Sequence, residues 1–305
     1  MKNLSMLTTE MRNPNSMTID NMSTIDILNT INKEDMTVAQ AVQKVLPEIK
    51  RTVDIVHERL KRGGRLFYVG AGTSGRIGIL DAVECPPTFS TTPHVVQAVM
   101  AGGIRAVEKA VEGAEDSEEL GANDLRERNL TELDVVIGIA ASGRTPFVTG
   151  ALKYAEEIGA TTVSLTSNKG SVISKYAEIK IEVETGPEVL TGSTRMKAAT
   201  AHKMILNMIT TVSMIKIGKV YENLMVDLKV SNRKLEERAK NIVSTITQVP
   251  YKKAEEVLVM TNYEVKPAIV MIKAGVSLEE AKKYIDEADG FVRQAIELAI
   301  EGGNE

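Results

Sequence analysis

Two turns with hydroxyl side chains are the part of the sequence best suited to hold a ligand. They read GAGTSG at residues 70–75 and SGRT at residues 142–145. Each follows a short apolar run and precedes a helical pattern, which predicts a strand-to-helix turn. Backbone amides at such a helix N-terminus bind anions, and the hydroxyls of Thr73, Ser74, Ser142 and Thr145 add further donors.

The first turn has the glycine spacing of a dinucleotide site, but an NAD site also needs an acid at the end of the second strand. Here that strand ends in Met100-Ala101-Gly102-Gly103, without a carboxylate. A purely structural tight turn is the alternative interpretation of the first turn, and a single turn of this kind could arise by chance. Ligands of parallel sheets bind at the carboxyl ends of strands, so two such turns together predict a site for one compact phosphate on a small molecule.

Several carboxylates lie near these turns in the sequence. Glu84 precedes Cys85-Pro86-Pro87, and the two prolines predict that a helix ends there. Glu112 and Glu115 belong to a second acidic group. A solvated surface charge is the alternative interpretation for each acid alone. Two acids beside one phosphate site indicate general acid–base catalysis.

Metal and covalent catalysis are not indicated. His57, His94 and His202 are scattered without zinc-ligand spacing, and Ser142 does not sit in a nucleophile elbow. Cys85 is the only cysteine, which rules out an internal disulfide and fits a reducing compartment. We therefore expect no metal and no cofactor.

Composition narrows the class of protein. The 305 residues carry a formal net charge of -4, with no basic excess to hold nucleic acid. The N-terminus is polar and lacks a signal-peptide core, and no apolar run approaches the roughly 18 residues of a membrane span. We expect a cytoplasmic protein that binds neither nucleic acid nor membrane.

The elements around the turns predict an α/β fold. Strand-like runs at 65–69, 95–100, 134–141, 161–166 and 179–183 alternate with helical patterns such as 106–112 and 146–158, which indicates a doubly wound, five-stranded parallel sheet. Residues 1–36 lack a long period and predict an arm. Thr37 can cap a helix over 38–60, with a kink or a break at Pro47. The predicted domains are the arm 1–36, an α/β domain 37–228 and a small helical C-terminal domain 229–305.

The chain resembles the N-acetylmuramic acid 6-phosphate etherases, a family built on a sugar isomerase (SIS) domain of flavodoxin-like topology. The resemblance runs nearly end to end. Its motifs are LTTE with Arg12-Asn13, GAGTSGRIG at 70–78, DAVECPP at 81–87, VEGAEDS at 111–117, GIAASGRTP at 138–146, GPEVLTGSTRMK at 186–197 and NLMVD at 223–227.

The resemblance implies a lyase that works as a homodimer without metal and serves recycling or use of cell-wall amino sugar. It would release D-lactate and N-acetylglucosamine 6-phosphate from N-acetylmuramic acid 6-phosphate. Glu84 would donate a proton to lactate and Glu115 would be the base. Binding and structural support both remain open for Glu188 and Arg195. The expected substrate-binding residues are Gly72, Thr73, Ser74, Ser142, Gly143, Arg144, Thr145 and Glu188.

Two other functions share this fold. An aldose–ketose isomerase would use the same phosphate turns but would not release lactate. A non-catalytic sugar-phosphate sensor would share the signature at 186–197, although the presence of both Glu84 and Glu115 argues against it.

Overall fold

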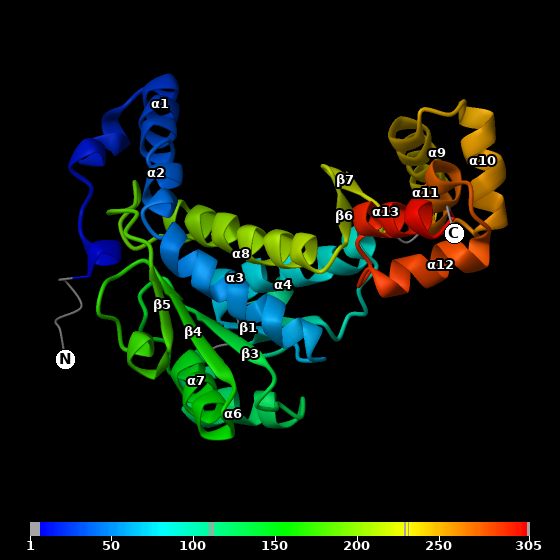
Figure 1. Cartoon of the computed structure of the whole chain (residues 1–305). Helices are drawn as coiled ribbons and strands as arrows, with labels where there is room; N and C mark the ends of the chain where they lie inside the picture. The colour runs from blue at the N-terminus through cyan, green and yellow to red at the C-terminus, as the bar shows by residue number, and fades with distance from the viewer. Residues whose placement is uncertain (1–6, 110, 112, 229, 231, 304–305) are drawn as a thin grey trace. The chain divides into compact units, whose positions relative to one another are not determined.

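Five parallel strands form the central sheet of the protein, shown in Figure 1 as a computed structural model that describes residues 7–109, 111, 113–228, 230 and 232–303. The strands run in the order β2-β1-β3-β4-β5, and every neighbouring pair is parallel. Their bounds are β1 Leu66–Gly70, β2 Val96–Met100, β3 Val135–Ile139, β4 Thr161–Thr166 and β5 Ile179–Glu182. The predicted five-stranded parallel sheet is confirmed.

Helices cover both faces of this sheet, which explains why β1, β3 and β4 are buried along their whole length. Phe67 and Val69 of β1 pack in one core with Val148 and Leu152 of α7. On the opposite face, Gly78 of α4 approaches Tyr68 closely. The bounds of these helices are α3 Leu46–Lys61, α4 Gly72–Phe89, α6 Glu118–Arg126, α7 Pro146–Ile158 and α8 Lys197–Lys216.

Short helices make up the C-terminal part of the chain, as predicted. They are α9 Arg233–Thr247, α10 Tyr251–Met260, α11 Val265–Ala274, α12 Leu278–Glu287 and α13 Val292–Gly302. A two-stranded hairpin that the sequence did not suggest precedes them, with β6 at Val220–Tyr221 and β7 at Leu224–Met225. Within the described ranges, no helix is long and apolar enough to cross a bilayer.

The chain divides by spatial contact into two compact units. One contains the described residues of Met1–Val83 and Pro93–Thr210, and the other contains those of Glu84–Thr92 and Thr211–Glu305. The hydrophobic core of the second unit includes Val226, Ala239 and Ile269. The domain boundary at 228/229 remains a proposal from the sequence.

The arm contains a helix that the sequence did not predict. Helix α1 spans Thr24–Asp35, and Ser23 caps it by accepting a hydrogen bond from the amide of Asp26. Its apolar residues are too few to give a clear period, so packing and the cap determine it. Thr37 occupies the N-cap position of α2 (Val38–Gln43), as predicted, but its side chain makes no capping bond: the hydroxyl donates instead to the carbonyl of Glu34, 2.7 Å away. The break near Pro47 is confirmed, since α2 ends at Gln43 and α3 begins at Leu46.

Two other helix boundaries differ from the expectation. Helix α4 does not stop at Pro86 and Pro87 but runs through both to Phe89. The prolines lie near its end, and the buried side chains of Cys85 and Phe89 hold these turns in place despite the missing amides. The helix expected at 106–112 is also shorter: α5 spans Arg105–Glu108.

Candidate active site

The first turn links β1 to α4 by a close approach of backbone. A Cβ atom at Gly75 would lie 2.8 Å from the carbonyl oxygen of Gly70, so glycine is required there. Gly72 has a positive φ of 52° and faces open space, with no atom within 4 Å of an added Cβ. Thr73 and Ser74 are half-buried on the first turn of α4. The exposed backbone at Gly72 thus leaves room for a ligand at the N-terminus of this helix.

A pocket of about 200 Å³ opens beside this turn. Gly72 and Arg76 of α4 line it, and so does Glu115, an exposed residue on the 3-10 turn Ala114–Asp116. The structure therefore brings one predicted catalytic acid to the predicted phosphate turn. Glu112, the other acid of that group, lies outside the described residues.

Arg76 connects the two sides of this pocket, and the sequence analysis did not single it out. Its Nε donates to the carbonyl of Val107 at 2.9 Å, and its Nη2 donates to the carbonyl of Ala106 at 2.8 Å. The guanidinium thus ties α4 to the segment that leads to Glu115. The sequence did offer one signal for Arg76, namely its position directly after Gly75 in the GAGTSGRIG motif.

The second turn lies at the neighbouring strand end, because β1 and β3 pair in parallel with Gly70 opposite Ile139. Gly143 has a φ of 69°, and a Cβ there would lie 2.2 Å from Cβ of Ser171, which excludes any larger residue. Ser142, Arg144 and Thr145 are half-buried around it. Thr145 precedes α7 without a side-chain capping bond.

Glu84 lies elsewhere on α4. It is exposed, and it lies about three helical turns beyond Gly72 on the same helix. It is not one of the residues that line the pocket with Glu115. The nearby Asp81 is buried and accepts hydrogen bonds from Tyr68 at 2.8 Å and from Asn207 at 2.6 Å. Asp81 therefore anchors α4 to β1 and α8.

Glu188 is fully buried and caps helix α8. Its two carboxylate oxygens accept from the amides of Lys197 at 2.9 Å and Ala198 at 3.0 Å. Burial raises the pKa of Glu188, and the two amide hydrogen bonds oppose that rise. This geometry favours structural support for Glu188 over direct contact with a ligand, while Arg195 of the same segment is exposed.

The arm packs on this signature segment and on the second turn. Asn13 and Ser16 donate to the carbonyls of Pro187 and Val189, at 3.1 and 2.7 Å. Asn168 accepts from the amide of Thr8 at 2.8 Å and donates to the carbonyl of Ala141, next to Ser142, at 3.0 Å. The arm therefore supports the backbone that forms the second turn.

A buried ion pair completes this contact. Nζ of Lys197 lies 2.5 Å from Oε2 of Glu34 on α1, and both side chains are buried. Burial alone would raise the pKa of Glu34, but hydrogen bonds from Lys197, Asn15 and Asn13 hold it below its ordinary value. Sequence reasoning missed this pair because its partners are 163 residues apart.

His202 is a buried core residue beside Ser167, whose hydroxyl lies 3.2 Å from its Nε2. Desolvation lowers its pKa to about 4, so the ring is neutral near pH 7. In the part of the chain that the structure describes, no three His, Cys, Asp or Glu side chains gather as metal ligands.

The chain matches known sequence families over most of its length. Residues 38–156 match the N-terminal SIS domain of glucokinase regulatory protein, and residues 118–212 match the SIS domain. Residues 222–268 match the C-terminal lid domain of glucokinase regulatory protein. Among solved structures, a phosphoheptose isomerase from Francisella tularensis shares the fold, with a TM-score of 0.50 and 17% identity over 63% of this chain and 98% of its own.

Curated relatives are much closer in sequence. The N-acetylmuramic acid 6-phosphate etherase of Bacillus subtilis (strain 168) is 57% identical over 97% of both chains. The enzyme of the same name from Clostridium acetobutylicum is 55% identical over 96% of this chain and 97% of its own. Such identity over nearly the whole length, together with the match to the SIS domain, establishes the family. The chain belongs to the N-acetylmuramic acid 6-phosphate etherases.

Proposed function

We propose that this protein cleaves the D-lactyl ether of N-acetylmuramic acid 6-phosphate, giving N-acetylglucosamine 6-phosphate and D-lactate. The observation that carries the proposal is the pocket in which Glu115 meets the N-terminus of α4 at Gly72. A carboxylate beside an anion-binding helix end can act on a carbon of a sugar whose phosphate the turn holds. Membership in the etherase family identifies this reaction as cleavage of the lactyl ether.

The chemistry is an elimination followed by addition of water. In the open-chain sugar, C2 carries an acidic hydrogen beside the C1 aldehyde, and C3 carries the lactyl ether. Glu115 removes the C2 proton, the C3–O bond breaks, and Glu84 protonates the departing lactate oxygen. Water then adds to C3 of the unsaturated aldehyde, and the proton returns to C2. Two carboxyl groups suffice for these steps.

The phosphate holds the reacting carbons in place. Amides and hydroxyls of the two turns, including Ser74, Ser142 and Thr145, bind it in substrate and transition state alike. That binding energy orients C2 and C3 toward the two acids. Cys85 is the single cysteine of the sequence, so it forms no internal disulfide, which fits the cytoplasmic location that we include in the proposal.

One assay separates this function from its rivals. The purified protein is incubated with N-acetylmuramic acid 6-phosphate, and lactate is measured by mass spectrometry. We expect equal amounts of lactate and N-acetylglucosamine 6-phosphate. An isomerase would convert a sugar phosphate without lactate, and a sensor would bind the substrate unchanged; either result overturns the proposal.

Replacing Ser74 or Ser142 by Ala should raise KM about tenfold, because each variant loses one hydrogen bond worth roughly 1.4 kcal/mol. The kcat should change little, since the bond is present before and during the reaction. Steady-state kinetics at several substrate concentrations separates the two constants. Ser277→Ala, in the capping box of α12, is the matched control and should leave KM unchanged.

Replacing Arg76 by Lys should lower kcat about tenfold with a smaller effect on KM. Lysine keeps the charge but cannot donate to two carbonyls with the geometry of guanidinium, so the segment that carries Glu115 loses its tie. Arg105→Lys changes an exposed residue of the neighbouring α5 in the same way and should have no effect. Equal losses in the two variants would exclude a positioning role for Arg76.

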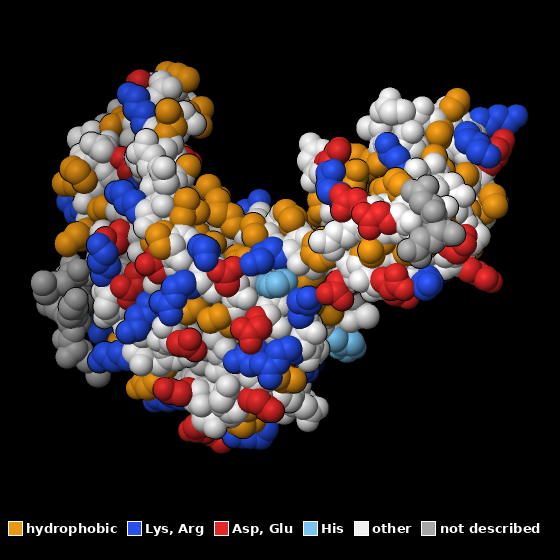
Figure 2. Space-filling model, in the orientation of Figure 1, with side chains coloured by type: hydrophobic (Ala, Val, Ile, Leu, Met, Phe, Trp, Pro, Cys, Tyr) orange, Lys and Arg blue, Asp and Glu red, His pale blue; other side chains and the backbone are white. Residues whose placement is uncertain are grey.

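A homodimer is part of the proposal. Ile25, Leu28 and Met36 of the arm are 61, 56 and 69% exposed. Figure 2 shows hydrophobic side chains on the surface of the part of the molecule that Figure 1 labels α1 and α2. Glu84 is exposed, and it is not one of the residues that line the pocket with Glu115. We therefore place Glu84 at the pocket of the partner subunit, so that each site takes one acid from each chain.

Mixing two inactive variants tests this arrangement. A Glu84→Gln chain and a Glu115→Gln chain, unfolded and refolded together in equal amounts, should recover about a quarter of normal activity. Half of the dimers are mixed, and each mixed dimer has one site with both acids. If no activity is recovered, both acids of each site come from the same chain. Light scattering that gives a mass near 33 kDa would exclude the dimer itself.

A further inference from the structure

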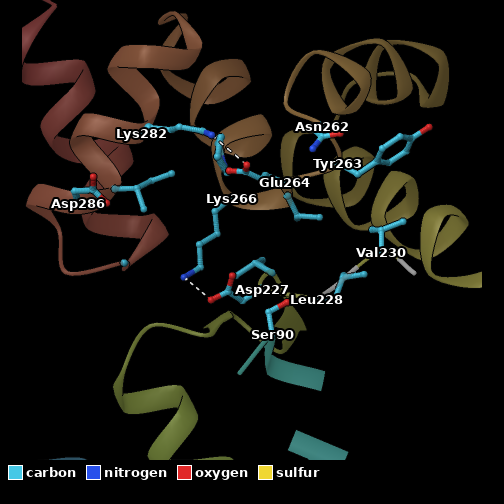
Figure 3. A pocket seen from close by; sticks show the side chains of 15 residues that line it. Ser90, Asp227, Leu228, Val230, Asn262, Tyr263, Glu264, Lys266, Lys282 and Asp286 are labelled. Carbon is cyan, nitrogen blue, oxygen red and sulfur yellow. Dashed lines mark hydrogen bonds and ion pairs between the residues drawn. The ribbon is translucent and has the colours of Figure 1, made fainter. Parts of the chain in front are cut away.

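A second cavity lies wholly within the C-terminal compact unit. Its volume is about 700 Å³, and the NLMVD motif, the start of α11 and helix α12 contribute to its walls (Figure 3). The motif was recognisable in the sequence, yet the proposed reaction does not use it. A volume of this size is typical of a small-molecule site.

The ion pairs of Lys266 and its neighbours leave one positive charge without a carboxylate of its own. Lys266 is buried, and its Nζ lies 3.0 Å from Oδ2 of Asp227. The same oxygen is 2.6 Å from Nζ of Lys219, so one carboxylate serves two ammonium groups. Burial lowers the pKa of Lys266, and Lys219 lowers it further, while Asp227 raises it. An additional anion would neutralise the remaining positive charge.

The first turn of α11 adds to this positive potential. Lys266 is the second residue of the helix, where backbone amides have no partner within the helix. Glu264 occupies the N-cap position but makes no side-chain capping bond. Its carboxylate pairs instead with Lys282 at 3.1 Å, and Figure 3 shows that pair apart from the pair of Lys266 with Asp227.

Three more charged residues line the cavity, namely Glu264, Lys282 and Asp286. Glu264 and Lys282 pair with each other and are about half exposed, and Asp286 is exposed. Water therefore screens these three charges more than it screens Lys266. The positive charge that an anion would meet is local to Lys266 and Lys219, which share the single carboxylate of Asp227.

The loop before α11 is held in an unusual conformation. Asn262 and Tyr263 both have positive φ, 50° and 61°, and both line the cavity. The amide of Tyr263 donates to the carbonyl of Leu258 at 2.7 Å, and its hydroxyl donates to Glu236 at 3.0 Å. These bonds fix a backbone conformation that residues other than glycine rarely adopt. This wall of the cavity is therefore formed before any ligand binds.

We propose that this cavity is a second binding site for a small molecule with a compact anionic group, held by Lys266 and the first turn of α11. The shared chemistry is a phosphate or a carboxylate. The proposal does not depend on the etherase reaction.

The test measures anion binding by calorimetry on the full chain. The host is a Ser74→Ala, Ser142→Ala variant, in which the turns of the proposed active site are weakened. Inorganic phosphate, glucose 6-phosphate and lactate are titrated separately, so that the free ion, a phosphate monoester and a carboxylate are distinguished. We expect saturable binding of at least one of them, and Lys266→Gln in the same host should weaken it at least about tenfold.

Matched variants distinguish binding at Lys266 from a general effect of lost positive charge. Lys282→Gln removes the same charge from the half-exposed pair of Lys282 with Glu264 and should change the affinity less than about threefold, and Lys266→Arg should retain binding. If Lys266→Gln fails to fold, Lys219→Gln removes a charge from the same cluster and should also weaken binding. No saturable binding, or equal binding in the host and in the folded Lys266→Gln or Lys219→Gln variant, would overturn the proposal. These results are independent of lactate release, so failure here leaves the proposed reaction standing.

Discussion

Replacing Glu115 by Gln should lower kcat at least about 100-fold, the effect expected when a general acid–base group is lost. Glutamine keeps the size and polarity of the side chain but cannot take a proton from C2. KM should change much less, because the turns still bind the phosphate. The measurement is steady-state release of lactate, after circular dichroism and light scattering have shown that the variant is folded and in its normal oligomeric state.

Glu84→Gln should show a similar fall in kcat if Glu84 protonates the lactate oxygen. Glu119→Gln is the matched control, because Glu119 is also exposed and lies four residues beyond Glu115; it should leave kcat unchanged. We also expect Glu112→Gln to cost less than Glu115→Gln. A Glu84→Gln enzyme with normal kcat and a raised KM would make Glu84 a binding residue, and the proton donor would then be another group.

Replacing Lys197 by Met should destabilise the contact between α1 and the signature segment by about 3–5 kcal/mol. The variant leaves the Glu34 carboxylate buried without its cation. Hydrogen exchange over residues 24–35 is the measurement, and protection should fall at least about 100-fold at pH 7. Lys50→Met is the control, since the exposed pair of Lys50 with Asp54 contributes about 0.5 kcal/mol or less.

The pH dependence gives an independent check of this pair. The folded protein holds the pKa of Glu34 below its ordinary value of 4.5, so the pair stabilises the fold above that pH. The contribution is lost as the pH falls through the lowered pKa. The difference between wild type and Lys197→Met should therefore shrink in acid, where Glu34 is protonated in both. A difference that stays constant down to pH 3 would contradict a role for the ion pair.

The sheet could be predicted because its sequence pattern is local. Runs such as Val135–Ile139 are apolar throughout, as strands covered on both faces must be, and glycine turns follow β1 and β3. The helical character of the C-terminal domain was likewise predicted from the sequence. The predicted helix boundaries were wrong where tertiary contacts outweigh the local preference of the residues, as at Pro86 and Pro87 in α4.

The site was only partly predictable, for a related reason. Motifs identified the turns and Glu115, whose shared pocket with Gly72 follows from strand order. Nothing local distinguishes a carboxylate that caps a helix, as Glu188 does, from one that binds a ligand. Arg76 and the pair of Glu34 with Lys197 act through contacts between distant segments, which residue types alone do not reveal.

The way the arm is held has a consequence for synthesis on the ribosome. Thr8, Asn13, Ser16 and Glu34 bond to residues 160–174 positions later in the chain. At about 5–20 residues per second, the first residues to emerge wait roughly 8–35 s for their partners to be made. The arm is therefore the first segment translated and among the last to find its place, and in that interval its apolar side chains are available to chaperones or to another nascent copy.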